Sequence, residues 1–428
     1  MRRPLALLLA SIVASAPMII AQSRPPGPSL LIRGVTVIDG SGGAPRAGAS
    51  VFVRDGRIAS IGQDAPDADL TIDGRSLFAV PGLIDAHVHL SGGPRAEVVE
   101  RLSRVLRGGV TTVFDMAGDV RMTSDLARES LAGDIDSPAI GYASLFAGPA
   151  FFTDPRVVAA SLGYRPGDAP WNREISSGTD LVHAVAEARG AGATTIKLYA
   201  ALDAPTVRRI GEEAARQHVR LVAHATVFPA KPSDLVGAGV KMLAHAAYLV
   251  WEGMPPSADF SKRARGDFAA VPADGAAMTA LLQSMRQRDV ALNPTLWIFS
   301  NGPAKDDLAA VRTPWMNAVT KRAQELGVTI AAGVDDMMSD RDPLPLLHRE
   351  LEALVQGATL TPMQALVAAT SGAAHAIGID DERGTLAPGK IADILVVDAD
   401  PAIDIRNTRR IRYVIKGGRL VRGDGALR

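Results

Sequence analysis

The sequence contains no cysteine, few aromatic residues and no excess of charge of either sign. The absence of cysteine excludes disulfide bonds, cysteine-ligated zinc, a thiol nucleophile and lipid attachment at a cysteine. The 46 basic and 46 acidic residues give a formal net charge of zero, and no long basic run offers the phosphate-neutralising surface that nucleic-acid binding needs. We therefore expect no nucleic-acid partner. Any metal site must use histidine, carboxylate or a less usual ligand.

Apolar residues are plentiful. Of the 428 residues, 47% are hydrophobic, which excludes an intrinsically disordered chain. At roughly 100–200 residues per domain the length suggests two or three domains, although a single α/β barrel takes about 250 residues on its own. We therefore expect at least one large buried core.

Residues 1–21 have the pattern of a secretory signal peptide. Two arginines precede an apolar run that extends to Ile20, and Ala21 follows. We expect cleavage near Ala21 and export to the periplasm or the medium. An uncleaved membrane anchor is the alternative, but the run is interrupted by serine and proline and is short beside the ~20 residues of a spanning helix. Residues 22–29 are then a proline-rich linker. The mature chain, with 46 − 2 = 44 basic and 46 acidic residues, is expected to be soluble, without stable membrane insertion.

Both ends of the remaining chain are rich in short β segments. Residues 30–80 contain β-branched runs separated by turns, including Asp55-Gly56, a strong signal for a two-residue hairpin. Residues 385–428 repeat this pattern, with turns at Pro388-Gly389 and Gly417-Gly418. Because each piece is too small for a good core of its own, we predict that the two form one small β-sandwich domain.

Residues 81–384 alternate short apolar runs with amphipathic helical patterns, which is typical of βα repeats. Strands are predicted at 83–90, 110–116, 139–145, 194–199, 220–226, 241–249, 290–297 and 328–334. Helices are predicted at 96–107, 180–189, 205–217, 276–287, 314–326, 346–356 and 362–377. Eight βα units predict an α/β fold, a (β/α)8 TIM barrel. An open doubly wound sheet is the alternative, but no glycine-rich phosphate loop follows the first strand.

Two histidines end the first predicted barrel strand. In such a barrel the active site lies at the C-terminal ends of the strands. His87 and His89 are two residues apart, so both imidazoles can face the barrel mouth about 6–7 Å apart at Cα, a separation that one metal ion can bridge. Alone, this pair is weak support for a metal site.

Four further polar residues end other predicted strands. Lys197, His224 and His245 end strands four, five and six at intervals of 27 and 21 residues, each about one βα repeat, and Asp335 follows strand eight. Each has an ordinary explanation when taken singly, such as a solvated lysine, a core histidine or a helix-capping aspartate. Their recurrence at one level of the barrel predicts a common site.

Several segments resemble the metal-dependent amidohydrolase superfamily over nearly the whole mature chain. One segment resembles the family's opening signature: Pro81-Gly82-Leu83-Ile84-Asp85-Ala86-His87-Val88-His89. A second resembles the family's return into its small β domain: Gly384-Thr385-Leu386-Ala387-Pro388-Gly389-Lys390-Ile391-Ala392-Asp393.

Three shorter segments resemble one branch of the superfamily, which contains imidazolonepropionase-like enzymes, Xaa-Pro and other dipeptidases, and ochratoxin-hydrolysing amidohydrolases. These segments are Asn293-Pro294-Thr295-Leu296, His348-Arg349-Glu350-Leu351 and Thr361-Pro362-Met363-Gln364-Ala365-Leu366.

The resemblance implies two divalent metal ions. The implied ligands are His87 and His89 on a buried alpha metal, His224 and His245 on a more exposed beta metal, Lys197 bridging both, and Asp335 on the alpha metal. Lys197 would be carboxylated by carbon dioxide, since a carbamate supplies two anionic oxygens where an ammonium would repel the cations. Zinc is expected because imidazole and carboxylate suit it, although the same ligands accept manganese, cobalt or iron.

The implied mechanism is hydrolysis without a protein nucleophile. Two cations lower the pKa of a shared water to around 7 or below. The beta metal polarises the substrate carbonyl, the bridging hydroxide attacks, and Asp335 accepts the proton and passes it to the departing amine. We expect an exported binuclear-metal amidohydrolase that cleaves the carbon–nitrogen bond of a small amide such as an N-acyl amino acid or dipeptide. A cyclic amidase or lactonase on the same centre is the alternative. A non-catalytic periplasmic binding protein is less favoured, because a binder would not need Asp335.

Three residues are predicted to contact the substrate. Tyr199 points to the same side of its strand as Lys197, Tyr248 follows His245 by three residues, and His348 begins a helix after the strand that carries Asp335.

The remaining polar residues and the longest loop are given structural interpretations. The other histidines, His183, His218 and His375, are interpreted as structural, and Asp336 as a cap or loop contact. Residues 147–175 are either a substrate cover or a plain surface loop. The oligomeric state is left open, with a homo-oligomer among the options.

Overall fold

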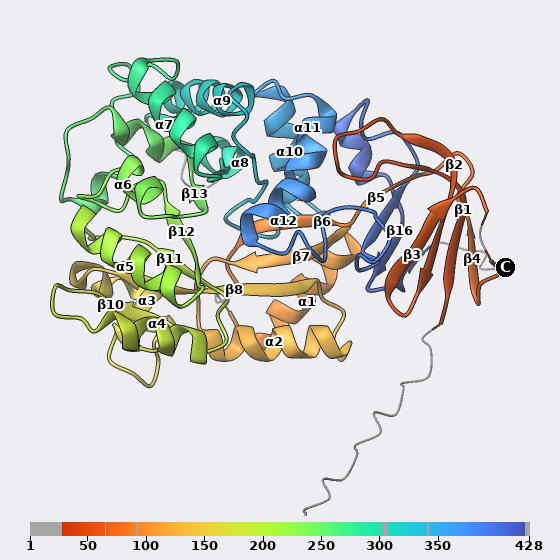
Figure 1. The fold of residues 1–428 in the computed structure, drawn as a ribbon, viewed down its shortest axis with the longest axis horizontal. Helices are drawn as coiled ribbons and strands as arrows, with labels where there is room; N and C mark the ends of the chain where they lie inside the picture. Colours follow the sequence, from red (N-terminus) through yellow and green to blue (C-terminus); the bar gives the residue numbers. More distant parts are fainter. Residues whose placement is uncertain (1–27, 65, 91–92, 302–306, 340–341, 424–428) are drawn as a thin grey trace, which may run out of the picture.

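The computed structural model describes residues 28–64, 66–90, 93–301, 307–339 and 342–423 (Figure 1). The signal-peptide and cleavage-site predictions, and most of the linker prediction, lie outside these residues. No helix in the described part of the chain is long and apolar enough to cross a membrane. The chain forms a helix-covered barrel with a separate sheet at one end of the molecule (Figure 1).

Both ends of the chain contribute to the separate sheet, whose strands run in the order β17-β16-β15-β5-β1-β2-β3, with β4 paired to β1. These strands are β1 (Leu30–Val37), β2 (Arg46–Arg54), β3 (Arg57–Gly62), β4 (Leu70–Asp73), β5 (Phe78–Pro81), β15 (Ile394–Val397), β16 (Ile411–Lys416) and β17 (Arg419–Gly423). The antiparallel pair β5 and β15 joins the two ends, with Val80 opposite Leu395. Side chains from both ends, including Ile32, Val51 and Ile394, share one apolar cluster. The prediction that the two pieces complete one another is confirmed.

Seven parallel strands form most of the barrel, each paired with the next in chain order. They are β6 (Leu83–Val88), β7 (Val110–Asp115), β8 (Ala139–Ala147), β11 (Thr195–Leu198), β12 (Arg220–His224), β13 (Met242–Ala244) and β14 (Ala291–Asn293). Most of their residues are buried, as expected for parallel strands that are covered on both faces.

The predicted eighth strand, residues 328–334, closes the barrel through a few hydrogen bonds rather than a regular ladder. On the β14 side, the amide of Ala331 donates to the carbonyl of Leu292 at 2.9 Å. On the β6 side, the amide of Ala86 donates to the carbonyl of Ala332 at 3.0 Å. This segment therefore lies between the first and last regular strands, and the predicted TIM barrel is confirmed.

Helices cover the outside of the barrel and connect its strands (Figure 1). They include α1 (Arg95–Arg107), α2 (Val120–Ala132), α4 (Leu181–Gly190), α5 (Ala204–Arg216), α6 (Pro232–Gly237), α7 (Ala276–Gln287), α9 (Ala309–Glu325), α10 (Leu347–Gln356), α11 (Pro362–Ala368) and α12 (Ser371–Ile377). Helix α5 shows why they form: Val207, Ile210 and Ala214 make a buried stripe at helical spacing, and the Asp203 side chain caps the amide of Thr206 at 2.9 Å.

Two predicted strands end well before the apolar pattern indicated, by 249 − 244 = 5 and 297 − 293 = 4 residues. The strand predicted at 241–249 stops at Ala244, and the chain continues as a 3-10 helix, η2 (Ala246–Glu252). The strand predicted at 290–297 stops at Asn293, and helix α8 (Leu296–Asn301) follows. The error has a physical cause, because a short, fully buried apolar run has the same composition in a strand and in a buried helix.

One predicted helix is in fact two. The helical pattern of residues 362–377 is interrupted at Thr370, whose φ of −131° and ψ of −100° are not helical. Helices α11 and α12 lie on either side of it. The alanine-rich composition of this stretch hides the break, because alanine favours a helix on either side of the turn.

The connection between β8 and α4 has structure of its own. It contains the 3-10 helix η1 (Pro149–Thr153), helix α3 (Pro155–Ala160) and the short strands β9 (Asp168–Ala169) and β10 (Asn172–Glu174). Strand β10 pairs in parallel with the end of β8, placing Asn172 opposite Leu145. The connection is therefore held against the C-terminal ends of the barrel strands.

Candidate metal centre

The six side chains predicted as metal ligands come together at the C-terminal ends of the barrel strands. Oδ1 of Asp335 lies 3.0 Å from Nε2 of both His87 and His89. These three residues offer ligand atoms within 4.8 Å of one another. On the other side of His87, its Nε2 lies 3.1 Å from Nζ of Lys197, and its ring centroid lies 5.0 Å from that of His245.

His224 completes the group from the neighbouring strand, because its ring centroid lies 4.7 Å from that of His245. Of the six residues, the four that are buried are His87, Lys197, His224 and His245. The side chains of His89 and Asp335 are 37% and 28% exposed, so they face the opening. The prediction that all six lie at one level of the barrel agrees with this arrangement.

Left-handed backbone is concentrated around this group. His245 has a φ of 72°, Asp335 a φ of 68°, Ala117 a φ of 99° and Thr295 a φ of 51°. A non-glycine residue in this region carries a conformational cost of order 1–3 kcal/mol, which the surrounding packing must offset. Such strain tends to cluster at functional sites, and here it turns side chains at the strand ends toward the barrel mouth.

The tautomer of His87 is fixed by Asn293. The side-chain amide nitrogen of Asn293 donates to the carbonyls of Ala331 at 2.9 Å and Gly333 at 3.3 Å, so its Oδ1 must be the atom that faces His87. That oxygen lies 2.8 Å from Nδ1 of His87 and can only accept. Nδ1 therefore carries the proton, and Nε2 of His87 is left with a free lone pair.

The same logic applies to two other imidazoles. Nδ1 of His89 lies 3.2 Å from the carbonyl oxygen of Ala117 and must donate to it. Nδ1 of His245 lies 3.0 Å from the hydroxyl of Thr295, which itself donates to the carbonyl of Pro294 at 2.8 Å. The Thr295 oxygen therefore accepts from His245. Both histidines are left with an unprotonated Nε2.

These residues fit a metal ion. Nε2 of His87 and Nε2 of His89 each carry a lone pair 3.0 Å from Oδ1 of Asp335, and such acceptors repel one another unless a cation lies between them. The 3.0 Å separations from Asp335 suit ligands that share one ion at the usual ~2.0–2.2 Å. Nδ1 of His224 is buried without a hydrogen-bond partner among the described residues, so it is available as a further ligand. Hydrogen bonds from the other ring nitrogen are the usual support of a metal-binding histidine.

Burial and neighbouring charges set the protonation states. Burial, with help from the charge of Lys197, lowers the pKa of His87 to about 4, and burial holds the pKa values of His224 and His245 well below the ordinary range. Burial lowers the pKa of Lys197 to about 8. Although burial alone would raise it, the pKa of Asp335 lies well below its usual value. His87, His224 and His245 are therefore neutral and Asp335 is ionised near neutral pH.

A cavity of about 470 Å³ opens beside the group. Phe151 of the β8–α4 connection lines this cavity. The connection therefore covers the site, which is one of the two interpretations given for residues 147–175. Tyr199 and Tyr248 also line the cavity, and their ring centroids lie 4.0 and 5.6 Å from that of His224. Both tyrosines therefore stand where the sequence placed them, beside the predicted metal ligands.

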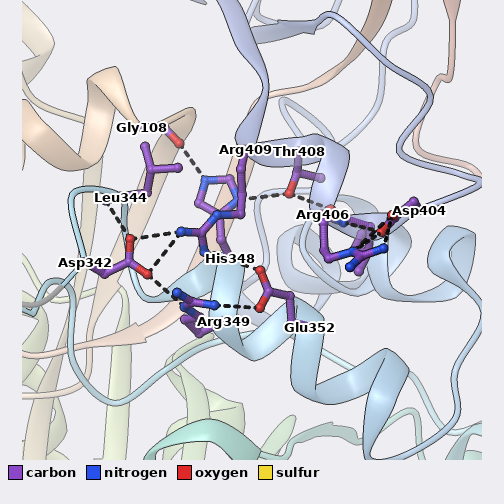
Figure 2. Close-up of polar contacts among 11 residues, drawn as sticks. Gly108, Asp342, Leu344, His348, Arg349, Glu352, Asp404, Arg406, Thr408 and Arg409 are labelled. Atoms are coloured by element: carbon purple, nitrogen blue, oxygen red, sulfur yellow. Dashed lines mark hydrogen bonds and ion pairs between the residues drawn. The ribbon is translucent and has the colours of Figure 1, made fainter.

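His348 lies away from the cavity and the proposed metal ligands. Its Nε2 donates to the carbonyl of Gly108 at 2.9 Å, and its Nδ1 lies 2.9 Å from the hydroxyl of Thr408 (Figure 2). Arg409 and Asp342 form an adjoining ion pair at 3.0 Å (Figure 2). The expectation that His348 contacts the substrate is therefore corrected. It was inferred from closeness in sequence to Asp335, but helix α10 carries it toward the separate sheet rather than the barrel mouth.

Other residues follow their structural interpretations. His375 lies between Asp289 and Asp380, at 2.9 and 3.1 Å, on the outside of the barrel. His183 lies 3.2 Å from Glu187, one turn further along α4. The carboxylate of Asp336 accepts from the amide of Met337, a loop contact.

Sequence reasoning missed the residues that support the ligands. Asn293 and Thr295 were noted only as part of a family-like motif, yet they orient His87 and His245. A usable signal was present, because Asn293 ends the seventh strand as the ligands end theirs. Three arginines that line the cavity, Arg156, Arg263 and Arg312, were also missed. They come from helix α3, helix α9 and an irregular segment, none of which is a barrel strand whose end the sequence pattern marks.

Comparisons with known proteins agree with this architecture. A sequence profile described as the amidohydrolase family matches residues 78–421. Ochratoxinase from Aspergillus niger is 25% identical over 96% of this chain and 90% of its own length. Enamidase from Eubacterium barkeri is 44% identical, but only over 73 residues, which are 15% of this chain and 19% of that protein.

Solved structures show the same fold. The crystal structure of A. niger ochratoxinase superposes with a TM-score of 0.73 at 23% identity, covering 93% of this chain and 96% of that chain. A Xaa-Pro dipeptidase with bound methionine superposes with a TM-score of 0.71 at 20% identity, covering 92% and 99%. With the profile match over most of its length, the chain belongs to the amidohydrolase family and is a hydrolase of carbon–nitrogen bonds.

Proposed function

We propose that this chain is an exported, binuclear-metal amidohydrolase that cleaves the amide bond of a small N-acyl amino acid or dipeptide. One observation carries the proposal: hydrogen bonds at Nδ1 leave Nε2 of His87, His89 and His245 unprotonated around one end of the barrel. An unprotonated imidazole nitrogen is a metal ligand, and two of these three lie 3.0 Å from a carboxylate oxygen that repels them unless a cation is bound. Zinc is the proposed metal, because the donor set is nitrogen and oxygen.

The remaining ligands divide the site between two ions. His87, His89 and Asp335 would hold one ion, and His224 and His245 the other. Lys197 lies between the two groups, with its Nζ 3.1 Å from Nε2 of His87. We propose that it is carboxylated, because a buried ammonium beside two cations would be strongly unfavourable.

The chain's own residues then perform the proton transfers. Two divalent cations held there would supply a water acidified to near neutral pH and a Lewis acid for the substrate carbonyl. Asp335, ionised and partly exposed at the cavity, accepts the proton of the attacking water and delivers it to the amide nitrogen as the carbon–nitrogen bond breaks. The products are a carboxylic acid and an amine. The aromatic walls at Phe151, Tyr199 and Tyr248 exclude bulk water from this transfer.

The choice of substrate rests on the relatives and on the size of the cavity. The dipeptidase among the structural relatives acts, by its name, on dipeptides. A cavity of about 470 Å³ suits a small molecule rather than a polymer. A cyclic amide or a lactone would use the same centre, and relative rates on esters and amides separate these alternatives.

The test is hydrolysis by zinc-reconstituted protein of a panel of N-acyl amino acids, dipeptides, cyclic amides and lactones. Asp335→Asn should lower kcat on the best amide by about 10²- to 10⁴-fold. The matched control is Asp336→Asn on the neighbouring residue, which among the described residues accepts a hydrogen bond from the amide of Met337 in its own loop and should change kcat less than about 3-fold. Faster hydrolysis of lactones than of any amide would favour the alternative. Metal-loaded protein that hydrolyses nothing in the panel would contradict the proposal.

Export is proposed from the amino-terminal pattern alone. Expression of the full chain in a two-membrane bacterium, followed by cell fractionation and intact-mass measurement, tests it. We expect periplasmic protein that has lost about 21 residues. Full-length protein that remains in the cytoplasm would contradict it.

A further inference from the structure

One arginine at the cavity lacks the partner that its neighbours have. Arg263 follows the 3-10 helix η3 (Phe260–Lys262) and lines the cavity. In the same segment, Lys262 lies 3.7 Å from Asp259 and Arg265 lies 4.0 Å from Asp307. Among the described residues, Arg263 forms no ion pair, and its Nε is buried without a hydrogen-bond partner.

Arg263 is held in place by neutral groups. Its Nη1 donates to the carbonyl of Phe260 at 3.1 Å, and its guanidinium lies 4.5 Å from the centroid of the same residue's ring. The backbone carbonyl of Arg263 accepts from the indole of Trp251 at 2.8 Å. The side chain is thus positioned before any ligand arrives, which reduces the entropy lost on binding.

The position of Arg263 relates it to the metal ligands. The ring of Phe260, which it covers, is stacked near His224, with centroids 5.9 Å apart and planes at 17°. The side chain of Tyr248 is hydrogen-bonded to Arg263, and its ring centroid lies 5.2 Å from that of His245. A guanidinium and a hydroxyl donor therefore stand together on the side of the cavity next to His224.

Charge around the cavity is unbalanced. Among the described residues that line it, Asp335 is the only carboxylate, and it already faces His87 and His89. Arg156, which also lines the cavity, pairs with Asp154 at 2.7 Å. Arg263 is therefore a partly buried cation without an anion, which is costly unless a ligand supplies one.

We infer that Arg263, with Tyr248, forms a subsite for the carboxylate of the amino acid that is released, so that the enzyme requires a substrate with a free carboxylate next to the scissile amide. This inference rests on the proposed function, since it assigns the substrate class at the same centre. A guanidinium offers a carboxylate two parallel hydrogen bonds, and the adjoining hydroxyl offers a third. Substrates in which this carboxylate is an ester or a carboxamide lack the anion at this place and are poor substrates.

The test compares two compounds that differ in one charge. N-benzoyl-L-phenylalanine carries the carboxylate, and N-benzoyl-L-phenylalaninamide is its neutral counterpart of nearly equal size. Binding to the zinc-loaded protein is measured by titration calorimetry, and hydrolysis by release of the amine. Wild type should bind the carboxylate about 10- to 100-fold more tightly than the amide, and Arg263→Met should remove that preference while leaving the affinity for the neutral compound within about 3-fold.

Two further variants separate the subsite from a folding defect. Arg265→Met, on the same segment but with an exposed side chain, should keep the wild-type preference. Arg263→Lys should keep part of it, because the charge remains but the paired hydrogen bonds do not. Circular dichroism checks that each variant is folded.

Failure of the subsite and failure of the proposed function give different results. If Arg263→Met weakens both compounds equally, or if wild type binds both alike or binds neither, the subsite is overturned. Hydrolysis of both compounds with equal efficiency would overturn the subsite while the proposed function stands. If neither is hydrolysed but the carboxylate is bound through Arg263, the subsite stands and the proposed reaction must be reconsidered.

Discussion

Oδ1 of Asn293 lies 2.8 Å from Nδ1 of His87, and this contact fixes which nitrogen of the imidazole is free. The contact depends on the close approach of the eighth barrel segment. A Cβ at Gly333 would lie 2.9 Å from the Asn293 amide nitrogen and 2.7 Å from the His87 backbone nitrogen. Only glycine permits this spacing. Three neighbouring strand ends therefore set the orientation of one ligand.

Asn293→Leu should weaken binding of the metal held by His87. The change removes the acceptor for Nδ1, so the ring can rotate or adopt the other tautomer, and loss of such support typically costs 10- to 100-fold in metal affinity. Competition with a chromogenic chelator measures the affinity of each bound ion. Two ions bound with wild-type affinities would show that the Asn293 contact is dispensable.

Thr295→Val should weaken the other metal instead. The hydroxyl of Thr295 accepts from Nδ1 of His245 at 3.0 Å, and valine keeps the shape of the side chain while removing that acceptor. We expect a loss of about 10- to 100-fold for the ion held by His245, with the first ion little changed. Thr295→Ser, which keeps the hydroxyl, is the matched control and should bind both ions nearly as wild type. Equal weakening by valine and serine would point to backbone strain at φ 51° rather than to the hydrogen bond.

His348 should make the folded state sensitive to acid. Burial lowers its pKa to about 4 from the ordinary value of 6.5. Between these values the unfolded chain binds a proton that the folded chain does not, so this contribution to stability is present above pH 6.5 and is lost as the pH falls toward 4. The full amount is about 3 kcal/mol. His348→Gln should be less stable at pH 7.5 but lose less stability on acidification.

Urea-unfolding midpoints at pH 7.5, 6 and 5 measure this difference. Acid also releases metal from both proteins, so the quantity to compare is the difference in stability between wild type and His348→Gln at each pH. This difference in stability should become smaller as the pH falls. A constant difference would mean that His348 titrates near 6.5 in the folded protein.

The barrel was predictable because its signal is local and repeated. Each buried parallel strand is a continuous apolar run, and each helix such as α5 has a stripe at helical spacing, so the order of elements could be derived without contacts. The ends of elements were not predictable where buried segments change conformation. At His245, with a φ of 72°, the chain leaves the direction of β13. Hydrogen bonds at the end of this strand determine that conformation, and the apolar character of the segment does not.

The site also has a part that the sequence predicts and a part that it does not. The six proposed ligands recur at about one βα interval, so the periodic pattern predicts that they lie together. The residues that orient these ligands do not recur in this way. Asn293 and Thr295 act through directed hydrogen bonds, and Arg263 reaches the cavity from an irregular segment whose path depends on packing against Phe260. His348 shows the opposite error, because a residue close to Asp335 in sequence lies against Gly108 and Thr408.

In the proposed centre Lys197 links two metal ions, and the metal content of the protein is the direct test of that link. Elemental analysis would compare wild type and Lys197→Ala, both purified from bicarbonate-supplemented medium. We expect about two zinc ions per wild-type chain and a sharp drop in the variant, because the side chain next to Nε2 of His87 would no longer bridge the two ligand groups. One metal per chain in both proteins would contradict it, and would make Lys197 an ordinary buried lysine beside a mononuclear centre.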